Sequence, residues 1–255
     1  MTNREILQIA LEQSALDCNC RPEDFLSGEN RVVLSRADPR ARAYLALPFA
    51  LDMVCYGAGI VAQASPQLQA TAAWYIGKYP AVHCFETPHI IALNEKLAAF
   101  GCKVCYMAEY FLPDTEALRP LGCRYPLRVL RPAEFAGCYT DTWANALCRQ
   151  RAELDVLAVG AFDGARLVGL AGCSADCSSM YQIGVDVLPA YRRQGIAAAL
   201  TSRLAAEVFA MGKVPFYCAA WSNIPSVRNA IRCGFRPAWA QLTARDSRFV
   251  DKLNR

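Results

Sequence analysis

The chain has 255 residues, of which 54% are hydrophobic and 20% charged, and its formal net charge at pH 7 is +4. A charge this small, without a dense run of lysine and arginine, argues against a nucleic-acid binder and fits a phosphate-sized anionic ligand better. No apolar stretch reaches the ~20 residues that cross a bilayer, so we expect no membrane partner. The length favours two domains over one.

The first fifteen residues, MTNREILQIALEQSA, place Arg4, Glu5 and Glu12 inside a helical period and contain no apolar signal core. We therefore expect a cytoplasmic protein. Its thirteen cysteines are an odd number in a large chain, so reduced thiols are the expected state. The pairs Cys18–Cys20 and Cys102–Cys105 lack the paired knuckles and the histidines that a structural zinc site needs, and we expect no metal.

The first half alternates strand and helix patterns. Ser65-Pro66 and Thr87-Pro88 are typical helix starts, and Gly101 is a typical helix end. The predicted elements are a helix over 2–16, strands over 31–36 and 51–64, a helix over 65–77, a strand over 81–86, a helix over 87–101 and a strand over 102–113.

Residues 113–132 contain four prolines and mark the predicted boundary. We expect an N-terminal α/β domain over 1–115, a linker over 116–126 and a second domain over 127–255. The second domain is predicted to hold a strand over 125–130, helical residues 133–154, a strand pair over 155–174 joined by Asp163-Gly164, a strand over 180–188, a helix over 195–211, a strand over 213–221, a helix over 223–233 and a strand over 235–243.

This order predicts a mixed α/β fold with an antiparallel meander in front and a crossover behind. The stretch VDVLPAYRRQGIAAAL, residues 185–200, lies where the third meander strand gives way to a helix. A helix N-terminus offers unpaired N–H groups to a phosphate, Gly195 lets the ligand approach, and Arg192 and Arg193 add forked donors. The alternative is that Gly195 only makes a turn and the arginines are a solvated rim.

A second motif follows at a fixed distance. Arg192-Arg193-Gln194-Gly195-Ile196-Ala197 matches the pattern Q/R-x-x-G-x-G/A, and Asn223-x-x-Ser226 is followed by Cys233-Gly234-Phe235. With both motifs in this strand order, residues 125–240 resemble the GNAT superfamily of acetyl-CoA-dependent N-acyltransferases. The resemblance implies a GNAT fold with a central mixed sheet in the second domain and acetyl-CoA as cosubstrate.

The resemblance also implies a set of cofactor contacts. Where strands 180–187 and 214–220 diverge, main-chain groups can bind the pantetheine arm as a pseudo-strand. Asn223 and Ser226 lie on one helix face, although Asn223 is equally explained as an N-cap. The cofactor-binding residues carried over are Val185, Val187, Arg192, Arg193, Gln194, Gly195, Ile196, Ala197, Ala198, Asn223 and Ser226.

The usual catalytic pair of the family is absent. The glutamate position reads Tyr181 or its neighbour Gln182, and the tyrosine position reads Ala230. Transfer from a thioester needs a neutral amine and an acid for the thiolate. We rank Tyr181 and Tyr217 first as catalytic residues, while Tyr217 is also explained as core. Asp176 and Asp186 are alternatives that could deprotonate the amine through water.

From residue 51 onward the first domain repeats the element order of the back half of the second, with Gly101 in the place of Gly234. This predicts a smaller, degenerate GNAT-like half that supplies a wall of the acceptor pocket. The tandem order is similar to the branch that includes the zwittermicin-resistance acetyltransferase, and more remotely to Fem-type aminoacyl transferases. Carboxylates that could hold a cationic amine, or that are merely solvated, are Glu86, Glu109 and Asp114.

These inferences favour an N-acetyltransferase that moves an acetyl group from acetyl-CoA to a primary amine of a small molecule by direct attack in a ternary complex. One alternative is a non-catalytic acyl-CoA-binding sensor or scaffold, because the usual glutamate and tyrosine are missing. Another is an acyl or aminoacyl transferase with a different donor. The identity of the amine, the acyl chain length and the oligomeric state stay open.

Overall fold

The computed structural model describes residues 1–255, which fall into two units. Unit 1 consists of Met1–Ile9 and Phe111–Pro237, and unit 2 of Ala10–Tyr110 and Ala238–Arg255. The chain passes between them within helix α1 (Asn3–Cys18) and strands β4 (Cys102–Pro113) and β10 (Phe235–Asp246). Domains over 1–115 and 127–255 stay a prediction about which stretches fold alone, since the observed units interleave along the sequence.

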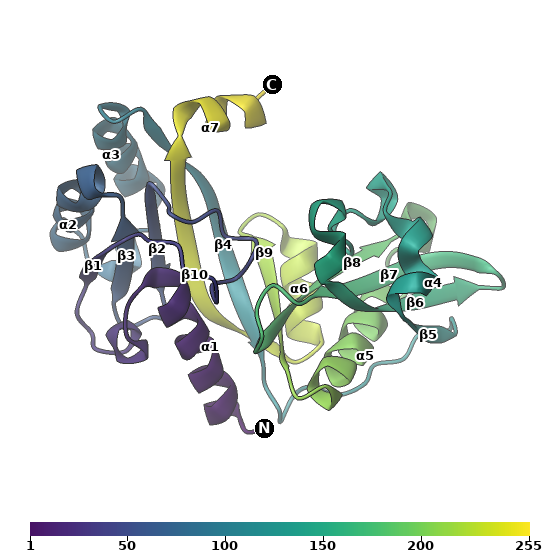
Figure 1. The fold of residues 1–255 in the computed structure, drawn as a ribbon. Coiled ribbons are helices and arrows are strands. Elements are labelled where there is room, and N and C mark those ends of the chain that lie inside the picture. The colour runs from purple at the N-terminus through teal and green to yellow at the C-terminus, as the bar shows by residue number, and fades with distance from the viewer. The chain divides into compact units, whose positions relative to one another are not determined.

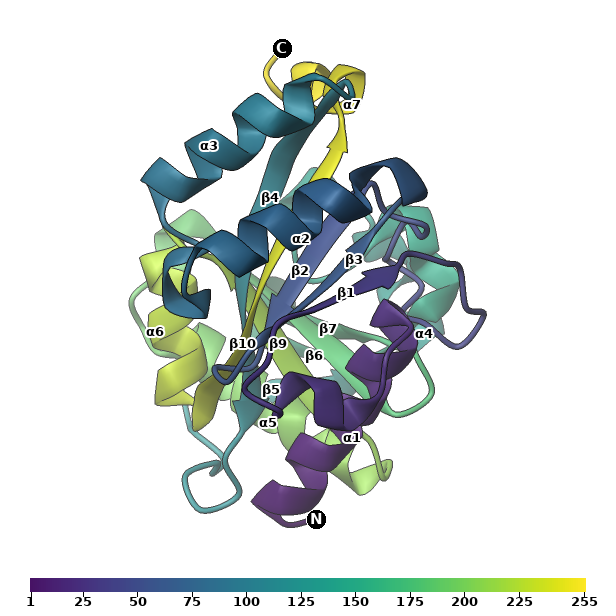
Figure 2. The same ribbon diagram turned by 90° about the vertical axis from the view of Figure 1, so that its left-hand side faces the viewer.

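Unit 2 is a sheet with α2 and α3 over one face (Figure 2), while α1 lies against the other face, where the Gln63 side chain donates to the Asp17 carbonyl. Its strands follow the order β1-β3-β2-β10-β4, in which β1 is parallel to β3 and β2 is antiparallel to both β3 and β10. Leu68, Ala72 and Leu93 from the helical segments pack on Leu51 and Met53 of the sheet. The bounds are β1 Arg31–Leu34, β2 Leu51–Cys55, β3 Ile60–Ala64, α2 Gln69–Lys78, α3 Thr87–Ala98 and α7 Ser247–Leu253.

Two predictions in this unit need correction. The strand expected over 51–64 is a hairpin, because the chain turns between Cys55 and Ile60. The prediction of a strand over 81–86 is wrong, because this stretch forms a 3₁₀ helix, Ala81–His83, in place of a strand. The backbone turns here because the N–H groups of His83 and Cys84 donate to the carbonyls of Pro80 and Ala81.

A buried polar row crosses the other face of the unit 2 sheet. Gln63 of β3, Asp52 of β2 and Thr243 of β10 are directly opposite one another in register. The Asp52 carboxylate accepts hydrogen bonds from the Thr243 hydroxyl at 2.6 Å and from the amides of Gln241 and Gln63 at 3.0 and 3.3 Å. Burial nonetheless raises the pKa of Asp52 to about 6. These hydrogen bonds offset part of the cost of the buried charge.

Unit 1 contains the predicted meander and crossover (Figure 1). Its strand order is β9-β8-β7-β6-β5, with antiparallel pairing from β5 to β8 and parallel pairing between β8 and β9. The mixed α/β fold class is therefore confirmed. The bounds are β5 Leu127–Leu130, α4 Pro132–Phe135, β6 Asp155–Asp163, β7 Arg166–Ser174, β8 Met180–Val187, α5 Ile196–Ala210, β9 Val214–Ala220 and α6 Ile224–Arg232.

The two faces of the unit 1 sheet are covered differently. Helices α5 and α6 cover one face, over a core that includes Ile183, Leu200 and Tyr217. The other face is covered by residues 132–154, which bury Trp143 and Leu147 against the sheet. The helical stretch expected over 133–154 is broken into α4 and short 3₁₀ turns, since glycine and the Thr-Asp pair within it are weak helix formers.

Candidate functional site

Strands β8 and β9 separate part of the way along their length. They pair from Met180–Ile183 to Val214–Tyr217, whereas β8 continues to Val187 and β9 to Ala220. The Leu188 N–H donates to the Val168 carbonyl of β7. In an antiparallel pair, only every second residue of a strand points its main-chain N–H and C=O groups at the partner strand. The main-chain groups of Val185 and Val187 therefore point away from β7 into the gap, where no β9 residue pairs with them.

The turn between β8 and α5 holds two residues in the left-handed backbone region, Arg193 at φ 63° and Gly195 at φ 79°. Gly195 is the residue before the first helical turn of α5, and the first helical hydrogen bond is donated by Ala199 to its carbonyl. The N–H groups of Ile196, Ala197 and Ala198 are therefore left for a ligand. The left-handed backbone at Arg193 costs on the order of 1 kcal/mol, which is typical of a functional turn.

A cavity of about 530 Å³ opens at this turn. Its charged lining residues are all arginines, Arg192 and Arg193 from the turn and Arg228 and Arg232 from α6. Four guanidinium groups beside a helix N-terminus make a strong site for an anion. The arginines of α6 were not singled out by sequence, although their spacing of four on a polar helix face was a usable signal. The predicted cofactor residues that line the cavity are Val187, Arg192, Arg193, Gly195, Ile196, Ala197 and Ala198.

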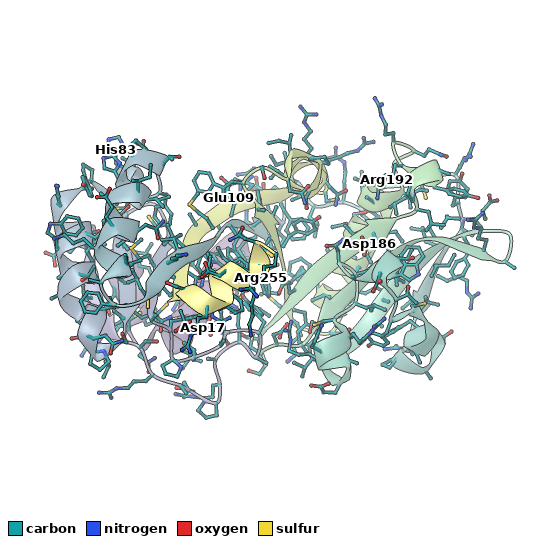
Figure 3. All side chains as sticks on the ribbon, turned by 90° about the horizontal axis from the view of Figure 1, so that it is seen from above. Asp17, His83, Glu109, Asp186, Arg192 and Arg255 are labelled. Carbon is teal, nitrogen blue, oxygen red and sulfur yellow. The ribbon has the colours of Figure 1, made fainter.

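Other predicted cofactor residues hold the turn in place. The Gln194 Oε1 accepts a hydrogen bond from the Tyr125 hydroxyl at 2.9 Å, and its Nε2 donates to the Ala190 carbonyl at 3.4 Å. The Nε of Arg192, labelled in Figure 3, donates to the Val187 carbonyl at 3.1 Å. A ligand that pairs with the Val187 carbonyl therefore shares this oxygen with Arg192 or displaces it.

The Asn223 side chain caps α6, because its Oδ1 accepts from the Ser226 N–H at 3.2 Å. The Ser226 hydroxyl lies 2.8 Å from the hydroxyl of Tyr217. Neither Asn223 nor Ser226 lines the arginine cavity, whereas Pro225 and Asn229 of the same helix do. A direct cofactor contact by Asn223 and Ser226 stays a prediction.

The two candidate tyrosines lie on the face of β8 and β9 that α5 and α6 cover. Tyr217 is the last paired residue of β9, so it marks the point at which the strands separate. It is 3% exposed, and burial raises its pKa, partly opposed by hydrogen bonds from Ser226 and Asn229. Tyr181 is half-buried within the paired part of β8, and burial raises its pKa as well.

A second cavity, of about 280 Å³, lies on the opposite face of the sheet. Asp155, Ser174, Gln182 and Gly184 line it together with residues 144–148. The Asp155 Oδ2 accepts from the Cys148 N–H at 2.8 Å, and burial raises the pKa of Asp155 to about 6. Sequence reasoning missed Asp155, because one acidic residue before an apolar strand looks like an ordinary solvated charge.

The aspartates that were considered as bases have structural contacts. Asp186, labelled in Figure 3, accepts hydrogen bonds from the N–H groups of Asn145 and Ala146, both at 2.9 Å. Asn145 and Ala146 also pack on Gly172 and Gly184, which are directly opposite each other in register. A Cβ on Gly172 would lie 2.2 Å from the Ala146 carbonyl oxygen, and a Cβ on Gly184 would lie 1.8 Å from the Asn145 carbonyl oxygen. Asp176 is buried, with an Oδ1 3.0 Å from the Arg151 Nε.

The three carboxylates suggested for a cationic amine have separate surroundings. Glu86 in unit 2 lies 2.8 Å from the ring of His83. Asp114 in unit 1 accepts a hydrogen bond from Asn3, which lowers its pKa, and it pairs with Arg236. No contact of Glu109 assigns it a role. No group of three or more histidine, cysteine or acidic side chains could hold a metal ion, all thirteen cysteines are free thiols, and no helix is both long and apolar enough to cross a membrane.

The sequence profile of the acetyltransferase (GNAT) family matches residues 124–235. No curated protein matches the chain by sequence. Similar solved structures include a GNAT-family protein of Novosphingobium aromaticivorans, with 21% identity, TM-score 0.43, and coverage of 56% of this chain and 66% of that one.

A second is an acetyltransferase of Colwellia psychrerythraea, with 17% identity, TM-score 0.44, and coverage of 58% and 60% of the two chains. The match thus spans less than two thirds of either of these two proteins. A third is an aminoglycoside N-acetyltransferase in complex with CoA, with 18% identity, TM-score 0.36, and coverage of 47% of this chain and 92% of that one.

Proposed function

We propose that the protein is an N-acetyltransferase that moves an acetyl group from acetyl-CoA to a primary amine of a small molecule, within a ternary complex. The observation that carries the proposal is the gap between β8 and β9 beside the arginine-lined cavity. This combination offers free main-chain groups for an extended arm and positive charge for phosphates at its outer end.

The N–H groups of residues 196–198 would bind the pyrophosphate of CoA, assisted by Arg192 and Arg193. Arg228 and Arg232 are placed in the same cavity for a further phosphate. Val185 and Val187 would then pair with the pantetheine arm along the free edge of β8. The thioester would arrive where the strands meet, next to Ile183 and Tyr217.

Tyr217 is our first candidate for the acid that protonates the departing thiolate. Its raised pKa keeps the hydroxyl protonated at neutral pH, and its contact with Ser226 fixes the orientation of the ring. Tyr181 is the second candidate, two positions before the end of pairing on β8. Alignment of the amine with the thioester supplies a further part of the rate by proximity.

One observation favours the rival function of a non-catalytic acyl-CoA sensor. Ala230, completely buried in α6, stands where many relatives carry the acidic tyrosine. An alanine cannot donate a proton. A sensor would bind CoA at the same cavity and release no thiol.

Incubation with acetyl-CoA and a panel of polyamines, amino acids and amine-bearing antibiotics separates the two functions. An acetyltransferase releases free CoA thiol in an amount that depends on the amine and yields the acetylated amine by mass spectrometry. A sensor shows calorimetric binding of CoA without either product. The absence of CoA binding would contradict both functions.

A further inference from the structure

The cavity beside Asp155 lies next to the gap between β8 and β9. Gln182 and Gly184 line this cavity and flank Ile183, the last paired residue of β8. The Gln182 Nε2 lies 2.9 Å from the sulfur of Cys218, the first β9 residue beyond the pairing. The cavity therefore borders the point at which the strands separate, on the face opposite to Tyr217.

We propose that this cavity binds the acceptor as a primary ammonium group and that the Asp155 carboxylate takes up the proton that the nitrogen must lose. The inference rests on the proposed acetyl transfer and names the acceptor end of that reaction. It assigns a base from the first residue of β6 in place of the glutamate that β8 lacks.

Three hydrogen-bond acceptors converge on the cavity. Asp155 accepts both its hydrogen bonds, from Cys148 and from the Tyr139 hydroxyl, through Oδ2, so Oδ1 has no partner within the chain. Ser174 is 8% exposed, and its buried hydroxyl has no hydrogen-bond partner. Gln182 donates through Nε2 and keeps its Oε1 for a donor. A primary ammonium has three N–H donors for these acceptors, whereas a quaternary ammonium has none.

The charges around the cavity favour a cation. Arg151 lines it, but the buried carboxylate of Asp176 lies 3.0 Å from its Nε and offsets its charge. Asp155 is 3% exposed and forms no ion pair, although the charge of Arg151 acts on it. A buried carboxylate binds an ammonium more strongly than a solvated one does, because little water competes for it.

The ionisation of Asp155 depends on its neighbours. Burial raises its pKa to about 6, hydrogen bonds from Cys148 and Tyr139 lower it, the charge of Asp176 raises it, and the charge of Arg151 lowers it. At neutral pH the carboxylate is therefore ionised and able to accept a proton. The titratable and charged groups that face it are Tyr139, Cys148, Arg151, Cys173 and Asp176.

The proton balance of the transfer is complete with these residues. The bound ammonium gives one proton to Asp155, which later releases it to solvent. The nitrogen lone pair forms a C–N bond with the thioester carbon, and the C–S bond breaks with its electron pair on sulfur. The second proton of the nitrogen ends on that sulfur, through the Tyr217 hydroxyl, as the thiol of CoA, and one N–H remains in the amide.

A binding measurement tests the site without any turnover. We would label aspartate carboxyls with ¹³C, assign Asp155 by its loss in Asp155→Asn, and titrate pH with and without saturating n-butylammonium. An ion pair should lower the apparent pKa of Asp155 by about one unit or more. Tetramethylammonium, which has the same charge and no N–H, should shift it by less than about a third of that. An Asp155 titration that n-butylammonium leaves unchanged would overturn the proposal.

A kinetic measurement then uses the best amine of the panel. Asp155→Asn should lower kcat by about 100-fold or more and abolish the rise of kcat/KM with pH near 6, with the Kd for CoA unchanged. Asp141→Asn makes the same change at an exposed position outside both cavities and should leave kcat and Kd as they are. Asp155→Asn with wild-type kcat would also overturn the proposal.

A third variant guards against loss of folding in Asp155→Asn. Ser174→Ala removes one acceptor and no charge, and it should raise KM for the amine by about tenfold with little change in kcat, which corresponds to one lost hydrogen bond. If the wild-type protein releases no thiol with any amine, the proposed function fails, and the carboxyl titration still decides whether the ammonium site exists.

Discussion

The strand that leads into a helix differs between the two units. In unit 2, β3 precedes α2 and is paired on both edges, with β2 over Ile60–Ala64 and with β1 over Val61–Ala64. In unit 1, β8 precedes α5 and loses its β9 partner after Ile183. Only the second arrangement leaves backbone donors and acceptors for an extended ligand. In the proposed function, this free edge is what distinguishes the strand–helix succession that binds CoA from the one in unit 2.

The starts of α2 and α5 also differ, and again only unit 1 has features that suit an anionic ligand. Helix α5 follows Gly195, whose backbone is in the left-handed region. Arginines of the preceding turn and of α6 line the cavity at this helix start. The segment before α2 is a 3₁₀ helix, Pro66–Leu68, without a basic residue in its first turn. The start of the helical segment in unit 2 therefore has no counterpart of the arginines that line the cavity before α5.

Buried acids also have different roles in the two units. Both carboxylate oxygens of Asp52 in unit 2 accept hydrogen bonds, which come from the side chains of Gln63, Gln241 and Thr243. Asp155 in unit 1 lines a cavity and uses only one of its two oxygens for hydrogen bonds within the chain. The first arrangement holds a sheet together, and the second is available to a ligand.

The largest expected effect is on the chemical step. Tyr217→Phe should lower kcat by about 100-fold while leaving the Kd for CoA unchanged, because it removes the acid and keeps the ring. Tyr106→Phe, at an exposed position in unit 2, is the matched control and should leave kcat as it is. Wild-type kcat in Tyr217→Phe would remove this residue from the mechanism and move attention to Tyr181.

The next effect is on cofactor binding. Arg192→Glu should weaken CoA binding by roughly 10- to 100-fold, because a charge-assisted hydrogen bond is replaced by repulsion. The loss should be greatest at low ionic strength. Arg36→Glu makes the same charge change at an exposed site in unit 2 and should not alter the Kd measured by calorimetry. Equal effects of the two changes would show that net charge, and no specific contact, governs binding.

A pair of glycine substitutions compares the two units directly. Gly195→Ala should weaken CoA binding by about tenfold, because a side chain makes the left-handed backbone at this position unfavourable and disfavours the turn that presents the N–H groups. Gly77→Ala, within α2, should leave CoA binding unchanged and stabilise the protein by about 0.5–1 kcal/mol. Unchanged CoA affinity in Gly195→Ala would contradict the role of the turn.

The smallest expected effect is on stability. Because the folded-state pKa of Asp52 is raised from 3.8 to about 6, the folded protein binds more protons than the unfolded chain between these values. Its contribution to the free energy of unfolding therefore falls as pH rises from about 4 to about 6 and stays low above that. Asp52→Asn should remove this dependence, a difference of a few degrees in Tm across the range. A Tm profile identical to that of the wild type would contradict it.

Much of unit 1 follows from its sequence, because its signals are local. The Asp163-Gly164 hairpin, the apolar meander strands and the turn around Gly195 depend on nearby residues, and each is where it was expected. The GNAT motifs add a strand order that local patterns alone do not supply. The cofactor contacts of Val185 and Val187 stay a prediction, and the free edge of β8 leaves room for them.

The rest depends on contacts between distant residues. Pairing of β10 with β2 places Ala240–Ala244 in unit 2, which no pattern within β10 indicates. The placement of Asn145 and Ala146 depends on Gly172 and Gly184, two residues that meet only in the folded sheet. Asp155 gains its raised pKa from burial in the folded protein. The wall of the acceptor pocket assigned to residues 1–115 stays a prediction.

The most direct test of the central claim is a titration of ¹⁵N-labelled protein with CoA, followed by amide chemical shifts. The account predicts that the largest changes fall on Val185 and Val187 and on residues 192–198, while the amides at the start of α2 do not move. Changes confined to other regions, or none on the Gly195 turn, would contradict it.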